Sequence, residues 1–225
     1  MDIFARLNEG LRRHGFGGSL QRVLRLGLRS AMRLAYLRER HIWYRLDMAS
    51  GRPRPPLPPR FDLRPASTHE LELLRPLETL GLQEARRRLA GGAQLWLLRE
   101  AGEAAFACWI FRGRTPVLAA RGGWMPLPSG IACLEDSVTA VRCRGRGLAP
   151  AVWARVADSL AEQGFTALIT KVAESNLPSR RAVEKAGFEA VARMDLVHVG
   201  PVTHVVIQPQ GDPHGVAYLR TALAR

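Results

Sequence analysis

The residues Arg144-Gly145-Arg146-Gly147-Leu148-Ala149 have the composition and spacing of an anion-binding turn. They lie between a strand-like run, Cys133–Val141, and a helix-like run, Leu148–Gln163. Because glycine has no Cβ, successive backbone N–H groups can point at one anion, and the helix adds roughly half a positive charge at its N-terminus. The flanking arginines add further charge. The pattern predicts a phosphate cradle, although short glycine patterns also occur in ordinary strand-to-helix turns.

A second motif follows at Asn176-Leu177-Pro178-Ser179, which precedes a helix-like run over Arg180–Ala186. Asn176 or Ser179 can cap that helix, Pro178 suits its first turn, and Gly187-Phe188 ends it. From the glycine turn onward, the expected order is therefore the turn, a helix, a strand at Ala167–Ala173 and a capped helix.

This order resembles the GNAT superfamily of N-acetyltransferases. The first family motif, Gln/Arg-x-x-Gly-x-Gly/Ala, is matched by Arg144–Ala149 and, in a second register, by Arg142–Gly147. The second motif is matched by Asn176, Ser179, Lys185, Gly187 and Phe188. The resemblance extends over roughly Phe61–Gln208. The run Leu134-Glu135-Asp136 together with Asn-x-Pro-Ser is locally most similar to the diamine acetyltransferases.

The resemblance implies that acetyl-CoA, or another acyl-CoA, is the co-substrate of an N-acyltransferase. The turn then binds the CoA diphosphate, and the preceding strand pairs with the amide-rich pantetheine arm. An amide near Val138–Ala140, beside a gap between splayed strands, polarises the thioester carbonyl. The cofactor contacts so implied are Thr139, Ala140, Val141, Arg144, Gly145, Arg146, Gly147, Leu148, Ala149, Asn176 and Ser179. Asn176 can serve both as helix cap and as cofactor contact.

The attacking amine must lose a proton, for which a carboxylate is the usual acceptor. Glu135 is our first candidate base and Asp136 the second, with Glu174 as a third. Neighbouring residues of a strand project to opposite faces, so only one of Glu135 and Asp136 is expected to meet the substrate. Alternatively, both carboxylates pair with nearby arginines. Val183 stands where many family members carry a tyrosine acid, so the thiolate leaves unaided or takes a proton from water.

The chain is expected to form an α/β protein (an α+β mixed sheet flanked by helices) with four parts: a basic helical extension at 1–50, a proline-rich linker at 51–60, the acyltransferase domain at 61–208, and a tail at 209–225. The helical pattern of the extension runs from Ser19 to Met48. Five prolines in Gly51–Arg60 favour an extended spacer or a strap along the domain. The further expected elements are strands at 60–64, 93–99, 104–112, 116–120, 131–141, 167–173, 189–199 and 202–208, and helices near 69–79, 82–90 and 216–224.

The net charge of +13 is concentrated in the extension, because Met1–Arg60 holds thirteen arginines and four acids. We favour an extension packed on protein over one on an anionic membrane, and a membrane over nucleic acid. The sequence is also compatible with a homodimer. The cysteines and histidines are scattered, which predicts no metal site and a reducing, cytoplasmic location. If the extension binds a membrane, the location is peripheral to that membrane.

Two functions remain open from the sequence. The first is acyl transfer to a primary amine of a small molecule or peptide, and the sequence does not specify this acceptor. The second is a degenerate domain that binds CoA without catalysis, with the extension contacting membrane or nucleic acid.

Overall fold

The computed structural model describes all residues except 1–35, 49–51, 78–80, 200–201, 212–216 and 224–225. The chain forms two compact units, Met1–Glu39 with Leu196–His204, and Arg40–Asp195 with Val205–Arg225. The predicted extension upstream of Tyr36 lies outside the described residues. The second unit holds the candidate site, and the site is built from its residues alone.

In the described part of the chain, eight strands form one mixed sheet in the order β10-β9-β1-β8-β7-β4-β3-β2. Strands β7 and β8 pair in parallel, whereas the pairs β1·β8, β2·β3, β3·β4 and β4·β7 are antiparallel. The bounds are β1 Tyr36–Asp47, β2 Phe61–Pro65, β3 Gln94–Glu100, β4 Glu103–Arg112, β7 Ile131–Thr139, β8 Ala167–Ala173, β9 Glu189–Val199 and β10 Val202–Pro209. The predicted mixed sheet is confirmed.

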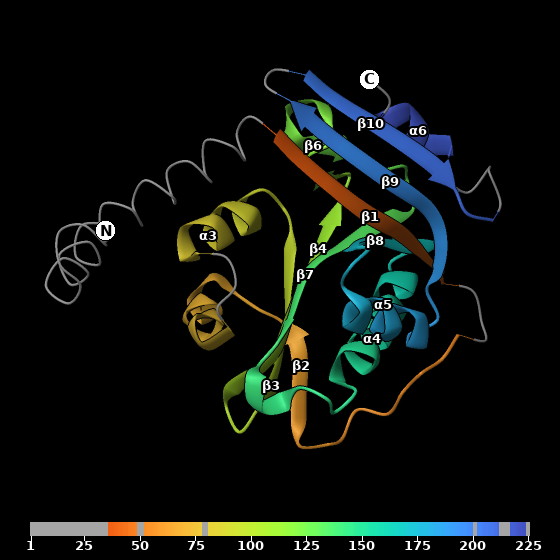
Figure 1. The fold of residues 1–225 in the computed structure, drawn as a ribbon. Helices are drawn as coiled ribbons and strands as arrows, with labels where there is room; N and C mark the ends of the chain where they lie inside the picture. Colours follow the sequence, from red (N-terminus) through yellow and green to blue (C-terminus); the bar gives the residue numbers. More distant parts are fainter. Residues whose placement is uncertain (1–35, 49–51, 78–80, 200–201, 212–216, 224–225) are drawn as a thin grey trace, which may run out of the picture. The chain divides into compact units, whose positions relative to one another are not determined.

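Helices cover both faces of the sheet. The helices are η1 Thr68–Leu77, α3 Leu82–Ala90, η2 Arg121–Gly123, η3 Val141–Cys143, α4 Leu148–Glu162, α5 Leu177–Lys185 and α6 Ala217–Leu223. Figure 1 shows η1 and α3 on one side of the central strands and α4 and α5 on the other. On the α4 side, Trp153 packs edge-on between Phe106 and Phe188, with both centroid distances 6.3 Å. No helix within the described ranges is long and apolar enough to cross a membrane.

The helix predicted up to Met48 is wrong for Tyr36–Asp47, which forms strand β1. From His41 onward β1 pairs with β8 in the register His41↔Ala173 to Asp47↔Ala167. Ile42, Trp43, Tyr44 and Leu46 are buried there, which suits β-branched and aromatic side chains in a strand covered on both faces. Pairing with a strand more than a hundred residues away outweighs the helical period of the preceding leucines and arginines.

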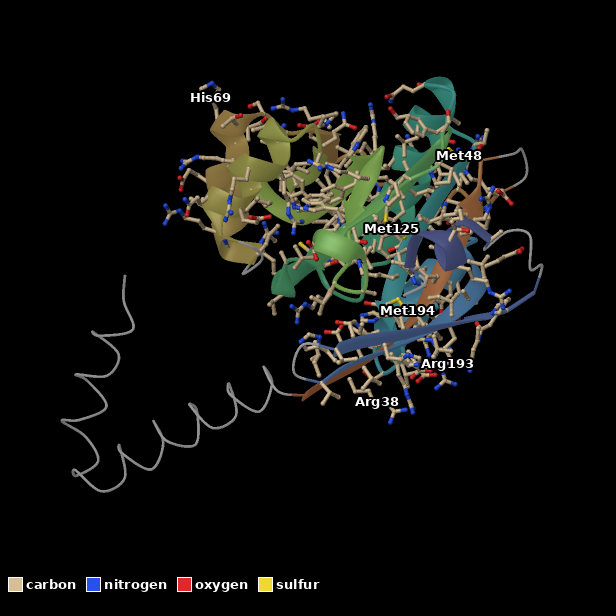
Figure 2. The ribbon with its side chains drawn as sticks, turned by 90° about the horizontal axis from the view of Figure 1, so that it is seen from above. Arg38, Met48, His69, Met125, Arg193 and Met194 are labelled. Atoms are coloured by element: carbon tan, nitrogen blue, oxygen red, sulfur yellow. The ribbon has the colours of Figure 1, made fainter. Side chains whose placement is uncertain are left out.

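The strand predicted at Pro116–Ala120 is also wrong. A short hairpin forms instead from β5, Arg114–Pro116, and β6, Trp124–Pro126. Between them Val117 donates its amide to the carbonyl of Gly123 at 2.9 Å, and Gly122 has a φ of 68° that closes the turn. Met125 of β6, labelled in Figure 2, is fully buried.

The proline-rich segment contacts the domain as a strap rather than hanging free. The Arg52 guanidinium is almost fully buried and forms an ion pair with Asp158 of α4. Pro53 lies over Gly187, the second residue after the end of α5. Gly187 has a φ of +89°, and a Cβ there would lie 2.7 Å from Cδ of Pro53. The Gly-Phe pair of the second motif therefore serves a close approach as well as a helix end.

Gly187→Ala is expected to lower the free energy of unfolding by about 2–4 kcal/mol, as the sum of a left-handed backbone cost and the clash with Pro53. Urea denaturation measures the loss. Gly164→Ala is the matched control, because Gly164 also follows a helix with a φ of +84° but has nothing within 4 Å of its added Cβ. Equal losses in the two variants would show that the contact with Pro53 contributes nothing.

Candidate active site

The glycine turn between β7 and α4 leaves a row of backbone donors without protein partners. Gly145 and Gly147 have φ values of 76° and 70°, which other residues rarely adopt. No described residue accepts a hydrogen bond from the N–H groups of Gly145, Arg146, Gly147, Leu148 or Ala149. These donors stand at the N-terminus of a 15-residue helix. The geometry is that of an anion-binding site.

The two arginines of the turn are not equivalent. Arg146 lies 3.3 Å from a carboxylate oxygen of Glu100, which also pairs with Arg60 and Arg142. Arg144 donates to the carbonyl of Thr139 at 3.3 Å and forms no ion pair with a described carboxylate. Arg144 is therefore the better placed of the two to add charge to an anion at the turn.

The strands β7 and β8 separate before they reach the turn. Their parallel pairing covers only Ile131↔Ala167, Ala132↔Leu168 and Cys133↔Ile169. Beyond that point β7 continues along β4 as far as Phe106↔Thr139, while β8 continues along β1 as far as His41↔Ala173. The facing edges of β7 and β8 are thus left without a ladder partner. This gap opens toward the glycine turn and can accept the backbone-like amides of an extended ligand.

The predicted contacts at the end of β7 differ in what they can offer. Ala140 donates to the carbonyl of Ala105 at 2.9 Å, and its own carbonyl accepts from Cys143 at 2.8 Å. The N–H of Val138, two residues before Ala140 and opposite Ala107, points toward β4 in the same way. An oxyanion donor near the gap is therefore left to Thr139. The next residue, Val141, exposes 74% of its surface. The exposed side chain of Val141 is able to contact an apolar part of a ligand.

At the other side of the gap, Asn176 accepts a hydrogen bond from the Ser179 amide at 3.2 Å, so its predicted role as a helix cap is confirmed. Its side-chain amide group has no partner among the described residues and remains able to donate to a ligand. Leu177 is 52% exposed at the first turn of α5. Leu177 was not predicted as a contact from the sequence. The signal for it was an apolar residue in the first turn of a predicted helix.

Glu135 lies in the gap and forms an ion pair with Lys171 of β8. Glu135 Oε1 is 2.5 Å from Lys171 Nζ and 3.4 Å from Cys133 Sγ, and only 9% of the residue is exposed. Burial raises the pKa of the Glu135 carboxyl above its ordinary value, and the Lys171 ammonium offsets only part of that rise. Burial alone would lower the pKa of Lys171, but Glu135 and other neighbours outweigh it and raise it. Sequence analysis missed this partner, although a lysine inside an apolar strand was a signal.

Lys171→Met is expected to lower the free energy of unfolding by about 3–5 kcal/mol at neutral pH, because it leaves the Glu135 carboxylate buried without a counter-charge. The loss should shrink at acid pH. A carboxyl whose folded pKa is raised is tolerated while it is protonated, and stability is lost as the pH rises through that pKa. Urea denaturation across pH measures this. Lys185→Met, on the exposed side of α5, should show no such pH dependence.

Asp136 does not point away from the face that holds Glu135, contrary to the prediction. Asp136 has a φ of 46°, and the register of β4 with β7 shifts between Ala107 and Trp109. This bulge breaks the alternation of side chains. Glu135 and Asp136 both face the α3 side, where Asp136 lies 2.5 Å from Arg88, whereas Ser137 bonds Trp153 of α4 at 3.1 Å.

Pairing of both carboxylates with arginines, the alternative from the sequence, therefore holds for Asp136 and is wrong for Glu135, whose partner is a lysine. Glu174, the third candidate, lies at the end of β8 next to Arg40 and Arg193, at 3.8 and 3.4 Å. Arg193 is labelled in Figure 2. The structure thus brings Glu135 and Asp136 together at the gap and leaves Glu174 among the arginines of β1 and β9.

No acidic group stands at Val183, which is 2% exposed and packs inward from α5. Tyr44 of β1 accepts a hydrogen bond from Arg180 at 3.2 Å and donates to Glu184 at 3.0 Å, on the same helix. Burial raises the pKa of Tyr44, and its hydrogen bond from Arg180 works against that rise. Both of these hydrogen bonds of the Tyr44 hydroxyl are made with residues of α5. The side chain of Tyr36 is not among those described.

Residues 64–188, more than half of the chain, match the model of a family described as "Acetyltransferase (GNAT) family". The chain therefore belongs to the acetyltransferase (GNAT) family, which confirms the resemblance at the level of the superfamily. Its closer likeness to diamine acetyltransferases stays a prediction.

Solved structures share the fold at low identity. A Drosophila protein is 17% identical with a TM-score of 0.54, and the match covers 82% of this chain and 58% of that one. A protein assigned to the GNAT family from Novosphingobium aromaticivorans is 18% identical with a TM-score of 0.51, covering 78% and 68%. The chain thus spans less than two thirds of the length of the Drosophila protein. No curated protein matches the chain.

Proposed function

We propose that the protein transfers an acetyl group, or another acyl group, from acyl-CoA to a primary amine by direct attack in a ternary complex. The observation that carries this proposal is the row of unpartnered amides over Gly145–Ala149 beside the gap between β7 and β8. Members of the GNAT family use acetyl-CoA as co-substrate, and the chemistry of this turn fits a diphosphate.

The residues of the chain suit each part of CoA. The amides of the turn and the N-terminus of α4 bind the diphosphate, with Arg144 adding a charge that no described carboxylate offsets. The open edge of β7 pairs with the amides of the pantetheine arm. Val141 and Leu177 give that arm apolar contacts on the two sides of the gap.

Proton transfer is assigned to Glu135. Its raised pKa makes it a stronger base than an ordinary glutamate while it is ionised, and the ion pair with Lys171 keeps it ionised inside the gap. Glu135 takes the proton from the attacking ammonium, and the amide of Thr139 stabilises the oxyanion that forms on the carbonyl. The thiolate leaves without a side-chain acid, because Val183 has no proton to give. Asp136 remains the second candidate base.

One observation favours the second function, CoA binding without catalysis. Glu135, the preferred base, already lies 2.5 Å from the ammonium of Lys171, and Val183 stands where many family members have a tyrosine acid. A domain that had lost catalysis and kept its turn would have this combination. Measured turnover distinguishes the two functions. Catalysis requires the incoming amine to reach Oε2 of Glu135, because Lys171 and Cys133 both contact Oε1.

Two measurements test the proposal. Calorimetry with CoA tests the turn, and absence of heat would contradict both functions. An acceptor screen that follows free thiol release from acetyl-, succinyl- and long-chain acyl-CoA tests catalysis and reports acyl length. Thiol release that depends on an amine supports the enzyme. CoA binding without release for any amine supports the binding module.

A further inference from the structure

Lys171 of β8 places a primary amine of the chain itself in the gap between β7 and β8. Its Nζ lies 2.5 Å from Oε1 of Glu135 and 3.3 Å from the carbonyl oxygen of Pro116, and its side chain is 16% exposed. The Trp43 ring covers the same nitrogen, which lies 5.8 Å from the ring centroid. An ammonium has three N–H groups, and these two acceptors occupy two of them. The amine therefore stands at the carboxylate to which we assign proton transfer.

Lysine is a rare residue in this chain. Lys171 and Lys185 are the two lysines of the sequence, and all its other basic residues of the 33 lysines and arginines are arginine. Arginine supplies the cation in the ion pairs of Asp136, Asp158 and Glu174. A guanidinium pairs well with a carboxylate but is not deprotonated in proteins, whereas a lysine can lose its proton and become a nucleophile. The lysine at position 171 thus allows chemistry that an arginine does not.

The environment of the ion pair permits Lys171 to give its proton to Glu135. Burial is the largest single influence on the pKa of each of these two groups, and it favours the neutral acid and the neutral amine. The attraction between the two charges works against burial and keeps the pKa of Lys171 raised. The ion pair is therefore the resting state. Movement of one proton from Nζ to Oε1 cancels both charges inside the gap and leaves an uncharged amine there.

Lys171 lies near the position that an attacking nitrogen must occupy. A general base contacts the nitrogen from which it takes a proton at about 3 Å. Both oxygens of Glu135 belong to one carboxylate, so an acceptor nitrogen at Oε2 is no more than about 8 Å from Nζ of Lys171. The four-carbon stem of lysine is flexible, so Nζ can move toward that position. When no acceptor is bound, Lys171 can therefore take its place.

The surroundings of Lys171 also contain donors for the oxygen of an acyl group. Nε1 of Trp43 and Oγ1 of Thr115 are buried and have no hydrogen-bond partner among the described residues. Trp43 covers Nζ, and Thr115 precedes Pro116, whose carbonyl accepts a hydrogen bond from Nζ. Buried donors without partners cost free energy. An acyl group on Nζ brings a carbonyl oxygen, which is the kind of acceptor that these donors lack.

We propose that the protein acylates its own Lys171 when it binds acyl-CoA and no free amine is present. One proton of Nζ passes to Glu135, the lone pair of Nζ forms a bond to the thioester carbonyl carbon, and the C–S bond breaks with its electron pair on sulfur. A second proton of Nζ goes to the thiolate. The products are a neutral acyl-lysine, a protonated Glu135 and free CoA, so the net charge of the gap is unchanged. This inference rests on the proposed function, because it uses the same base and the same thioester.

The test is mass spectrometry of the full-length protein incubated with acetyl-CoA and no amine. The mass of the isolated protein is recorded first, so that an acyl group already present on Lys171 is counted. We expect one acetyl group per chain on Lys171, located by peptide mapping, and one equivalent of free thiol. Lys185, exposed on α5, is the internal control. Uncatalysed acylation favours this exposed amine, whereas a general base should make Lys171 react about 10²-fold faster or more.

Two results of this mapping would overturn the inference. The first is acetylation confined to Lys185 or to the terminal amine of the chain. The second is a protein that binds acetyl-CoA and acquires no acetyl group.

Lys171→Arg keeps a positive charge beside Glu135 and removes the nucleophile, because a guanidinium is not deprotonated. It should lose the thiol release that occurs without an amine and keep its affinity for CoA. Lys185→Arg is the matched control and should still be acetylated on Lys171. Glu135→Gln should slow this acetylation about 10²- to 10⁴-fold, as expected when a general base is removed. Thiol release at the parent rate in Lys171→Arg contradicts the assignment. Should Lys171→Arg fail to bind CoA, peptide mapping of the parent protein still decides.

The inference and the proposed function fail differently. Acylation of free amines by a protein whose Lys171 stays unmodified would leave the proposed function standing and overturn the inference. Acetylation of Lys171 without turnover of any free amine would support the inference and limit acyl transfer to the chain itself. Absence of both reactions would overturn both.

Discussion

Glu135→Gln is expected to lower kcat for amine acylation about 10²- to 10⁴-fold, the range lost when a positioned general base is removed, and to leave Kd for CoA unchanged. The amide keeps the shape of the side chain and cannot take up the proton of the attacking ammonium. Because the glycine turn begins beyond the end of β7, its amides do not depend on this carboxylate. Steady-state thiol release and CoA calorimetry measure the two quantities.

The ion pair with Lys171 requires a control for folding. Glu135→Gln alone leaves an ammonium buried without its partner, which by itself costs stability. The double variant Glu135→Gln with Lys171→Met restores charge balance, and it should unfold near the parent midpoint while staying inactive. Asp136→Asn tests the second candidate, whose side chain is 46% exposed and bound to Arg88. A large loss of kcat in Asp136→Asn, with turnover intact in Glu135→Gln, would exchange the two roles.

A parent protein that releases no thiol with any amine would instead favour the binding module. Glu135→Gln would then change stability alone. The same pair of measurements therefore separates a base from a structural ion pair, because CoA affinity reports the integrity of the turn independently of chemistry.

The parts of the site that sequence reasoning located are those determined by neighbours in the chain. The turn at Gly145 and Gly147 follows from glycines that adopt left-handed φ values immediately before a helix. The cap at Asn176 follows from its spacing to Ser179. Both are local arrangements, in which residue type and spacing fix the backbone with little help from the rest of the fold.

The parts that were missed depend on pairing between distant strands. Lys171 meets Glu135 across 36 residues, and the bulge at Asp136 arises from the register of β4 against β7. The sequence alternation at Glu135 and Asp136 carries no sign of that shift. Likewise, β1 becomes a strand because β8 offers it a buried edge, and its own upstream period is helical. Tertiary pairing overrides local propensity at each of these positions.

Gly147→Ala is expected to weaken CoA binding about tenfold to a hundredfold, with the effect carried by the diphosphate. Gly147 has a φ of +70°, and an added Cβ meets nothing within 4 Å. A side chain there shifts the turn toward ordinary φ values and turns the donors away from a common point. Calorimetry with CoA and with pantetheine, which lacks the diphosphate, measures the effect. Only the affinity for CoA should fall.

The backbone cost must be separated from the loss of the anion site. Gly164→Ala has a similar φ of +84° and equally open space, at the other end of α4. Both variants should lose about 1–2 kcal/mol of unfolding free energy, since each places an L-residue in the left-handed region. CoA affinity should fall only in Gly147→Ala. Because the two positions differ in little except the amides they orient, unchanged CoA binding in Gly147→Ala would show that these donors do not hold the diphosphate, and the acyltransferase proposal would lose the observation on which it stands.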